Sequence, residues 1–403
     1  MPKKIPIMVV LSIFAFGCTG DGERVVRDLT ENEHKLVAGS NVFGFGLMKE
    51  VVAQSDGGNV FISPLSVSCA LGMTYNGARG STEEGMRLAL EYGDLTTGEI
   101  NQSYRDLIDL LTGLDPKVSM EIANSVWVRE GFEVLQAFID LNQTYFDAVV
   151  ENLDFDDPSA ADTMNAWVAD KTHDKIDSIV EPPIDPLTVM FLINAIYFKG
   201  TWTYRFDPAD TQPDTFHGPA GDETVQLMHL QGDLPCYATE TFLAVDLPYG
   251  DEMFSMTVIL PKSGVDIDAL VAELDSDSWA DWLAGFAVRE ADVFLPRFEL
   301  EFGSSLNDVL SALGMGAAFS AGADFTGINP AGELYISNVK HKTYVKVDEE
   351  GTEAAAVTSV EVSNLSISNS FTLRADRPFL FIIHDAHSKA LLFMGKMVDP
   401  PSE

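Results

Sequence analysis

The chain has 403 residues, 46% of them apolar, and its 62 acidic and 25 basic side chains give a formal net charge of -37. This apolar content can bury a large core, and no long polar linker divides the chain, so we expect a single folded domain. The charge argues against nucleic acid and against anionic glycans such as heparin, because both require clustered Lys and Arg.

The N-terminus is typical of an export signal. Lys3 and Lys4 precede an apolar run, residues 5–16, that is too short to span a bilayer. Residues 15–18 are similar to a bacterial lipobox, in which Cys18 would carry the lipid. Both an outer-membrane lipoprotein and a freely secreted extracellular protein fit this segment. We assign residues 1–18 to the signal peptide, 19–40 to a polar tether and 41–400 to the folded domain.

Hydrophobic periodicity predicts the following elements. Helical spacing predicts helices over 41–53, 65–77, 103–111, 136–146, 160–171, 267–283 and 304–313, the last capped by Ser304 or Ser305. β-rich runs predict strands over 121–128, 149–154, 189–198, 241–247, 253–260, 290–301, 334–347, 379–385 and 390–397. Helices crowd the first half and strands the second, which indicates an α+β fold with large mixed or antiparallel sheets.

Catalytic and metal-binding motifs are absent from the sequence. No GxSxG, HExxH, CxxC or GxxxxGK pattern occurs, and no cofactor or metal is expected. Besides Cys18 the chain has two cysteines, Cys69 and Cys236, so at most one disulfide is available. Cys69 lies in an apolar helical pattern and is expected in the core. These observations argue against an enzyme.

The segment VDEEGTEAAAVT, residues 347–358, has an unusual pattern. At period two, Thr352, Ala354, Ala356 and Thr358 share one face, and every one of them is small or β-branched. Its Ala and Glu content also favours a helix, so a helix remains an alternative. The β-rich flanks, 334–347 and 357–367, favour a strand that could slide between two existing strands without large pockets.

Several segments, in this order, resemble the serpins, inhibitors that trap proteases by inserting a reactive loop into their own sheet. The segments are NVFISPLSVSCALGMTYNGARGSTEEGM (59–86), LINAIYFKGTW (192–202), LPYGDEMFSMTVILP (247–261), VFLPRFELEFGSSL (293–306), ADFTGI (323–328) and DRPFLFIIHDAHSKALLFMGKMVDP (376–400). The resemblance covers nearly all of the chain after Asn41. It implies a monomer with the α+β serpin fold: helices on a large central mixed sheet, two further sheets and an exposed reactive loop.

The resemblance also implies roles for individual residues. The hinge of the reactive loop comprises Glu349, Glu350, Gly351, Thr352, Glu353, Ala354, Ala355, Ala356, Val357 and Thr358. The shutter, a buried polar cluster where the sheet opens, comprises Ser63, Pro64, Ser66, Asn194 and His341. The breach, where the loop enters, comprises Trp202 and an ion pair between Arg297 and Glu349. The reactive bond joins Leu365 to Ser366, although Asn364 or Ser366 could be the residue attacked because loop lengths vary.

The implied activity is inhibition by covalent trapping. Leu365 suits an apolar specificity pocket, so the expected targets are chymotrypsin-like proteases, with elastase-like, subtilisin-like and cysteine proteases of the cathepsin kind as further classes. The hinge contains no proline and no charge on its small-residue face, although Val357 is bulkier than the usual Ala. A non-inhibitory serpin acting as a binding or chaperone-like protein, and an enzyme of α+β class, are the alternatives.

Overall fold

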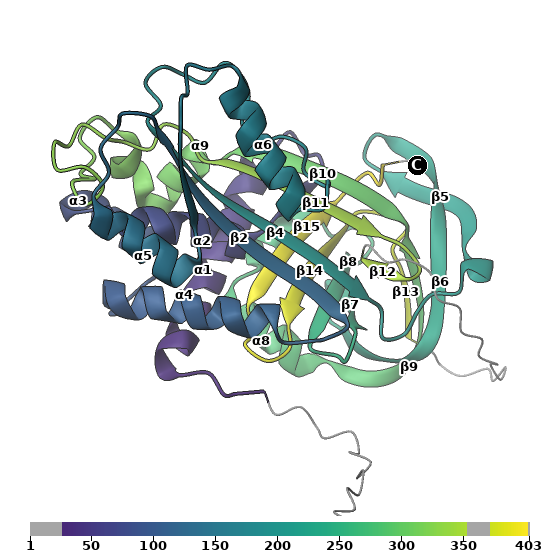
Figure 1. Ribbon diagram of the computed structural model, residues 1–403. Helices are drawn as coiled ribbons and strands as arrows, with labels where there is room; N and C mark the ends of the chain where they lie inside the picture. Colours follow the sequence, from purple (N-terminus) through teal and green to yellow (C-terminus); the bar gives the residue numbers. More distant parts are fainter. Residues whose placement is uncertain (1–25, 353–370, 402–403) are drawn as a thin grey trace, which may run out of the picture.

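The computed structural model describes residues 26–352 and 371–401, which form two sheets surrounded by helices (Figure 1). The helices are α1 (Glu31–Gln54), α2 (Pro64–Tyr75), α3 (Gly80–Ala89), α4 (Thr97–Thr112), α5 (Gln136–Phe146), α6 (Ser159–Lys171), α7 (Ile267–Glu273), α8 (Ser276–Gly285) and α9 (Asn307–Leu310). The strands are β1 (Val60–Ile62), β2 (Val118–Arg129), β3 (Val149–Leu153), β4 (Met190–Thr201), β5 (Gln212–Gly218), β6 (Gly221–Ala238), β7 (Phe242–Tyr249), β8 (Phe254–Pro261), β9 (Ala287–Pro296), β10 (Phe298–Ser305), β11 (Lys340–Val347), β12 (Gly351–Thr352), β13 (Phe371–Arg374), β14 (Phe379–Asp385) and β15 (Leu391–Met397).

The two sheets differ in size and order. The six-stranded sheet has the order β10-β11-β12-β4-β2-β3 and is mixed, because β2 and β3 run parallel while the other neighbours run antiparallel. The nine-stranded sheet has the order β1-β15-β14-β8-β7-β6-β9-β13, with β5 paired to β6. Its long strand β6 pairs in turn with β5, β9 and β7, which joins the two further sheets of the prediction into one.

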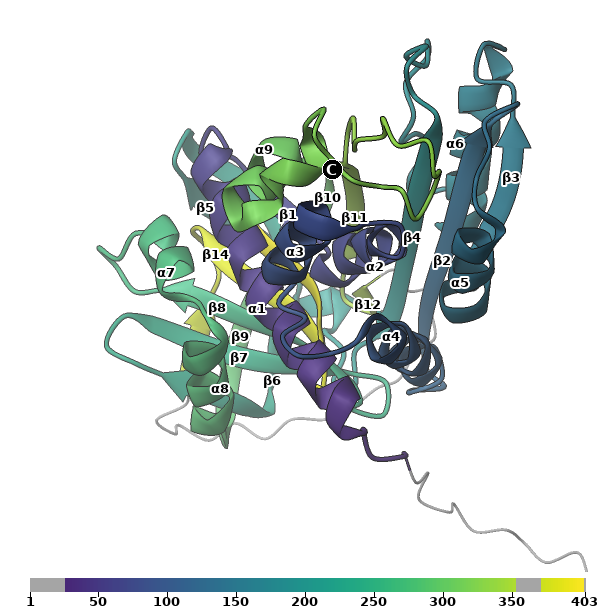
Figure 2. The same cartoon turned by 90° about the vertical axis from the view of Figure 1, so that its left-hand side faces the viewer.

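Helices cover both faces of the six-stranded sheet. In Figure 1, α6 lies in front of β2 and β4, and the apolar cluster between them includes Trp127, Met164 and Ile193. On the other face α2 packs against β4 and against β15 of the nine-stranded sheet, so that it lies between the two sheets (Figure 2). The α+β class with a large mixed sheet, predicted from the order of the elements, is confirmed.

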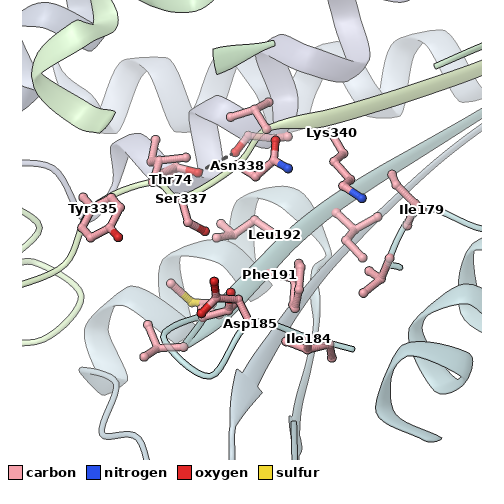
Figure 3. Close-up of a pocket in the computed structure, with 18 of the residues that line it drawn as sticks. Thr74, Ile179, Ile184, Asp185, Phe191, Leu192, Tyr335, Ser337, Asn338 and Lys340 are labelled. Carbon is pink, nitrogen blue, oxygen red and sulfur yellow. Dashed lines mark hydrogen bonds between the residues drawn. The ribbon is translucent and has the colours of Figure 1, made fainter. Parts of the chain in front are cut away.

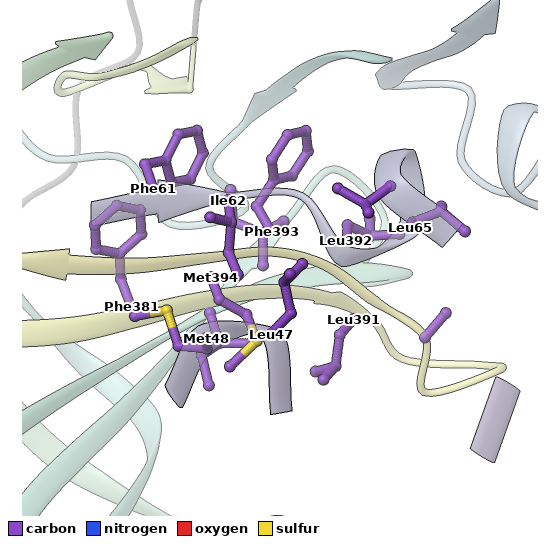
Figure 4. Packing of buried hydrophobic residues seen from close by; sticks show 14 of the residues in the cluster. Leu47, Met48, Phe61, Ile62, Leu65, Phe381, Leu391, Leu392, Phe393 and Met394 are labelled. Atoms are coloured by element: carbon purple, nitrogen blue, oxygen red, sulfur yellow. The ribbon is translucent and has the colours of Figure 1, made fainter. Parts of the chain in front are cut away.

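The core between the sheets is aromatic. Phe61 of β1 stacks on Phe381 of β14 with ring centroids 5.5 Å apart, and on Phe393 of β15 at 5.3 Å (Figure 4). Leu47 and Met48 of α1 close the same cluster from the helical side. These side chains come from segments more than 300 residues apart in the sequence, so the cluster joins the first and last parts of the described chain.

The first helix begins earlier than predicted. Thr30 caps α1 by accepting a hydrogen bond from the Glu33 backbone, and Leu36 and Val37 are buried. Residues 31–40 therefore belong to the folded domain, and their assignment to the tether is wrong. The helix is long and apolar enough to cross a membrane, but 56% of its most apolar window is buried inside the fold, as in a core helix.

Other predicted boundaries also change. The helix predicted over 267–283 is two helices, because Asp275 caps α8 and interrupts the pattern. The strand predicted over 290–301 is divided into β9 and β10 at Arg297. Ser304 and Ser305 end β10 instead of capping a helix, and residues 334–339 are not a strand. The sequence prediction missed α3, β1, β5, β6 and β13.

Gly395 provides a test of the aromatic core. It pairs with both Phe61 and Phe381, and a Cβ at this position would collide with the Phe381 ring. We expect Gly395→Ala to lower the free energy of unfolding by about 1–3 kcal/mol in urea titrations, the usual cost of overpacking a core. Gly232 of β6 has no heavy atom within 4 Å of its would-be Cβ. Gly232→Ala is therefore the matched control, and equal losses in both variants would contradict the packing argument.

Candidate functional site

In the described part of the six-stranded sheet, only the two-residue strand β12 lies between β4 and β11, so most of this strand position is unfilled by the described residues. The two-residue strand β12 occupies one end of this position, at the C-terminal ends of β4 and β11, where Thr352 pairs with Gly200 of β4 and with Val347 of β11. Both ladders are antiparallel. Beyond Thr352, the described residues contain no bridge that joins β4 to β11 directly. The two strands are thus held one strand width apart.

Two hollows lie between β4 and β11 on the side of Thr352 away from the breach. A small hollow of about 20 Å³ lies below Thr352, lined by Ile196 and Phe198 of β4 and by Val345 of β11. Farther along is a cavity of about 640 Å³ (Figure 3). It is lined by the N-terminal ends of β4 and β11, by α2 and by residues from 179 to 189.

At the breach, a tight turn delivers the chain into the sheet. Residues 348–351 close on themselves through the hydrogen bond from the Asp348 backbone N–H to the Gly351 carbonyl, at 3.0 Å. Trp202 binds this turn twice: its backbone N–H donates to the Glu350 carbonyl and its indole Nε1 to the Asp348 carbonyl, both at 2.9 Å. Gly351 has a φ of +152°, and a Cβ there would collide with the Gly200 carbonyl, so glycine is required.

The predicted breach ion pair between Arg297 and Glu349 is present in the structure. Arg297 Nε lies 2.7 and 2.8 Å from the two carboxylate oxygens of Glu349, and the Thr211 hydroxyl also donates to Glu349. Burial opposes ionisation of Glu349, but the hydrogen bonds from Arg297 and Thr211 outweigh it and lower the pKa of Glu349. The charged pair therefore fixes the residue that precedes the turn.

Thr352, the first residue of the small-residue face, is buried and points into the protein. Its hydroxyl lies 2.7 Å from the hydroxyl of Tyr249, the last residue of β7. The Tyr249 ring stacks on Trp202, with centroids 4.3 Å apart and an interplanar angle of 13°. Sequence reasoning missed Tyr249, although it lies in the quoted segment LPYGDEMFSMTVILP; its position there carries no sign of a partner 103 residues away.

The shutter residues fall into two groups. Ser63 caps α2, its backbone N–H donates to His341 Nε2 at 3.0 Å, and its hydroxyl donates to the Leu392 carbonyl at 2.7 Å. The Ser66 backbone N–H donates to Ser63 Oγ at 3.2 Å, and Pro64 is the first residue of α2. Ser63, Ser66 and His341 thus form one network beneath β11.

Asn194 lies on the opposite side of the strand position. Its Nδ2 donates to Asn124 Oδ1 at 2.8 Å, and Asn124 Nδ2 donates to the Phe146 carbonyl. Asn194 Oδ1 is buried and has no hydrogen-bond partner among the described residues. Asn124 was also missed by sequence reasoning, although an Asn within the apolar strand EIANSVWV is a usable signal of a buried polar contact.

The remaining predicted site residues lie outside the described residues. They are Cys18 of the lipobox, the hinge residues Glu353, Ala354, Ala355, Ala356, Val357 and Thr358, and the reactive bond Leu365–Ser366.

Nucleophile and metal chemistry find no support in the described part of the chain. Cys69 and Cys236 are buried free thiols, and burial raises the pKa of Cys69 to about 12 and that of Cys236 to about 11. Both thiols stay protonated at neutral pH and are poor nucleophiles. No group of three or more His, Cys, Asp or Glu side chains within residues 26–352 and 371–401 could hold a metal ion.

The shutter predicts a pH dependence of stability. Burial lowers the pKa of His341 to about 4, so in the fold it stays neutral and accepts from Ser63, whereas the unfolded chain binds a proton near pH 6.5. Between these values the unfolded state binds more protons, and the free energy of unfolding falls by about 2 kcal/mol from pH 7 to pH 5 on this account.

His341→Gln should remove this part of the pH dependence in urea titrations at pH 7 and pH 5. His34 is exposed on α1, so His34→Gln should keep it. The same decrease in His341→Gln as in the parent protein would show that another group titrates.

Comparisons with known proteins agree with this arrangement. The family model "Serpin (serine protease inhibitor)" matches residues 38–400. An uncharacterised serpin-like protein of Thermococcus kodakarensis is 34% identical, with 99% of each chain covered, and Iripin-8 of Ixodes ricinus is 34% identical, with 92% of this chain and 95% of Iripin-8 covered. The crystal structure of tengpin, a thermophilic serpin, in its native state superposes with a TM-score of 0.83 at 31% identity, covering 93% of this chain and 96% of tengpin. The chain belongs to the serpin family.

Proposed function

We propose that the protein inhibits serine endopeptidases as a suicide substrate and traps them covalently by inserting its cleaved loop into the six-stranded sheet. One observation carries the proposal: among the described residues no strand follows β12 between β4 and β11, and Thr352 is already paired on both sides while Gly351 is paired with β4. A strand that continues from Thr352 would find a partner along each edge.

The register of β12 specifies where each later residue would go. Six residues beyond Thr352 is Thr358, and six residues back along β4 from Gly200 and along β11 from Val347 are Asn194 and His341. Continued insertion would bring Thr358 between these two shutter residues. Its hydroxyl would meet the buried Asn194 Oδ1, which has no partner among the described residues. A polar group would then be satisfied that is unsatisfied before insertion.

The chemical step follows from the connectivity of the loop. The protease serine attacks the carbonyl carbon of Leu365, the peptide bond to Ser366 breaks, and the new amino terminus at Ser366 leaves. The protease is then joined by an ester to the segment that begins at the hinge. Insertion of that segment would carry the protease along the sheet and displace its oxyanion hole, which slows hydrolysis of the ester by orders of magnitude.

Leu365 supports an assignment of target class. A branched apolar side chain at the attacked residue fits the apolar pockets of chymotrypsin-like proteases first, and those of elastase-like and subtilisin-like proteases and cathepsin-like cysteine proteases next. The net charge of -37 gives no support to activation by heparin.

Incubation with purified proteases of these classes tests the proposal. We expect a complex that survives hot detergent with at least one chymotrypsin-like or subtilisin-like enzyme, and a released C-terminal peptide that begins at Ser366, read by mass spectrometry. Cleavage by every protease without any complex would instead identify a non-inhibitory serpin. A complex with a different released end would keep the mechanism and move the reactive bond.

The buried face of the hinge predicts the effect of a charge. Thr352→Arg would place an unpaired cation in the closed space beside Tyr249, which is strongly unfavourable. We expect loop insertion to slow and the number of inhibitor molecules cleaved per trapped protease to rise by about tenfold or more. Thr144 is exposed on α5, far from the hinge in Figure 1, so Thr144→Arg is the matched control. Equal trapping by both variants would refute the assignment of the face.

A further inference from the structure

We infer that Tyr249 is a positioning residue whose hydroxyl pins Thr352 in the sheet and thereby sets the register in which the reactive loop inserts. The role in loop insertion rests on the proposed function. The hydrogen bond between Tyr249 and Thr352, called the pin below, is a feature of the uncleaved protein. The pin requires a hydroxyl-bearing side chain at position 352, and a small apolar residue there could not form it.

The ring of Tyr249 is held rigidly beneath the entry point. It stacks on Trp202 and meets Phe198 edge to face, with centroids 5.2 Å apart. A Cβ at Gly200 would lie 2.8 Å from the Tyr249 Cδ1, so the glycine in β4 makes room for the ring directly below the strand that pairs with Thr352. These contacts restrain the ring from following a displaced hinge.

The Tyr249 hydroxyl makes its hydrogen bond with Thr352. Tyr249 is fully buried, burial raises its pKa, and the hydroxyl therefore remains protonated and able to donate. Thr352 Oγ1, at 2.7 Å, is its hydrogen-bond partner. If the hinge leaves the sheet, a buried hydroxyl loses that partner, which disfavours withdrawal of the hinge.

The same bond selects one register. Shifting a strand by one residue turns every side chain to the other face of the sheet. A slip of one residue here would put Gly351 or Glu353 over the Tyr249 hydroxyl and would turn the small-residue face outward. Neighbouring backbone pairs cannot distinguish these registers, because every residue of the segment has an N–H and a carbonyl. The hydroxyl pair is formed in the observed register and is broken by a one-residue slip.

Hydrogen exchange of the uncleaved protein tests the pin without any protease. Tyr249→Phe and Thr352→Val each remove one hydroxyl at nearly constant shape. We expect the amides of residues 351–352, measured by mass spectrometry, to exchange about three- to tenfold faster in each variant, as for the loss of one hydrogen bond. The double variant should resemble either single variant, because both remove the same bond.

Two further variants separate the pin from general loosening. Thr352→Ser keeps the hydroxyl and should keep the slow exchange. Tyr104 is another fully buried tyrosine, whose hydroxyl donates to the Ser68 carbonyl in the helical layer, so Tyr104→Phe should leave residues 351–352 unchanged. Unchanged exchange in Tyr249→Phe, or additive effects in the double variant, would overturn the inference.

Trapping assays on the same variants address the consequence. With a protease that the parent protein traps, Tyr249→Phe and Thr352→Val should consume severalfold more inhibitor per complex than Tyr104→Phe. Unchanged consumption would overturn the role of the pin in insertion. Faster exchange in a protein that traps no protease would leave the pin standing and refute the proposed function.

Discussion

In the described structure β4 and β11 do not pair with each other, and Thr352 bridges the two strands at one end. Buried backbone groups are normally paired, so a strand added between β4 and β11 would gain free energy by pairing with both. The breach and the shutter lie at successive points along this position. The breach holds the chain as it enters, and the shutter places polar groups where an arriving strand would pass.

How much of the fold could be predicted depended on how local each pattern is. The limits of β14 follow from a run of apolar residues that pack on both sides, and they agree with the prediction. In contrast β6 was missed, because its first four residues are polar or glycine, it contains Pro235, and its 18 residues pair with three different strands, β5, β9 and β7. Residues 334–339 have the composition of a strand but border the large cavity, and their backbone hydrogen bonds go to Ala318 and Leu306 and not to a neighbouring strand among the described residues.

The candidate site likewise has features that could be predicted from the sequence and features that could not. The residue types at the breach and the shutter could be assigned from the resemblance to serpins. At the breach Arg297 binds Glu349, and at the shutter Ser63 binds Ser66 and His341. The sequence could not show that Asn194 pairs with Asn124 and not with His341, since that depends on how far β4 and β11 are parted. Tyr249 was beyond reach for a similar reason: its partner is chosen by the register of a two-residue strand.

The size of the hollows matches the order of side-chain sizes on the small-residue face of the loop from Ala354 to Val362. Continuing the register from Thr352 would place Ala354 opposite Phe198 and Val345, where the hollow is about 20 Å³ and a larger side chain would collide with packed neighbours. Val360 and Val362 would arrive opposite Leu192 and Met190, beside the cavity of about 640 Å³, where bulk adds apolar contact. In the proposed insertion, small residues would therefore enter where the sheet is tight and larger ones where it is open. A loop with the reverse order would collide at its first step, before any gain from the open end could act.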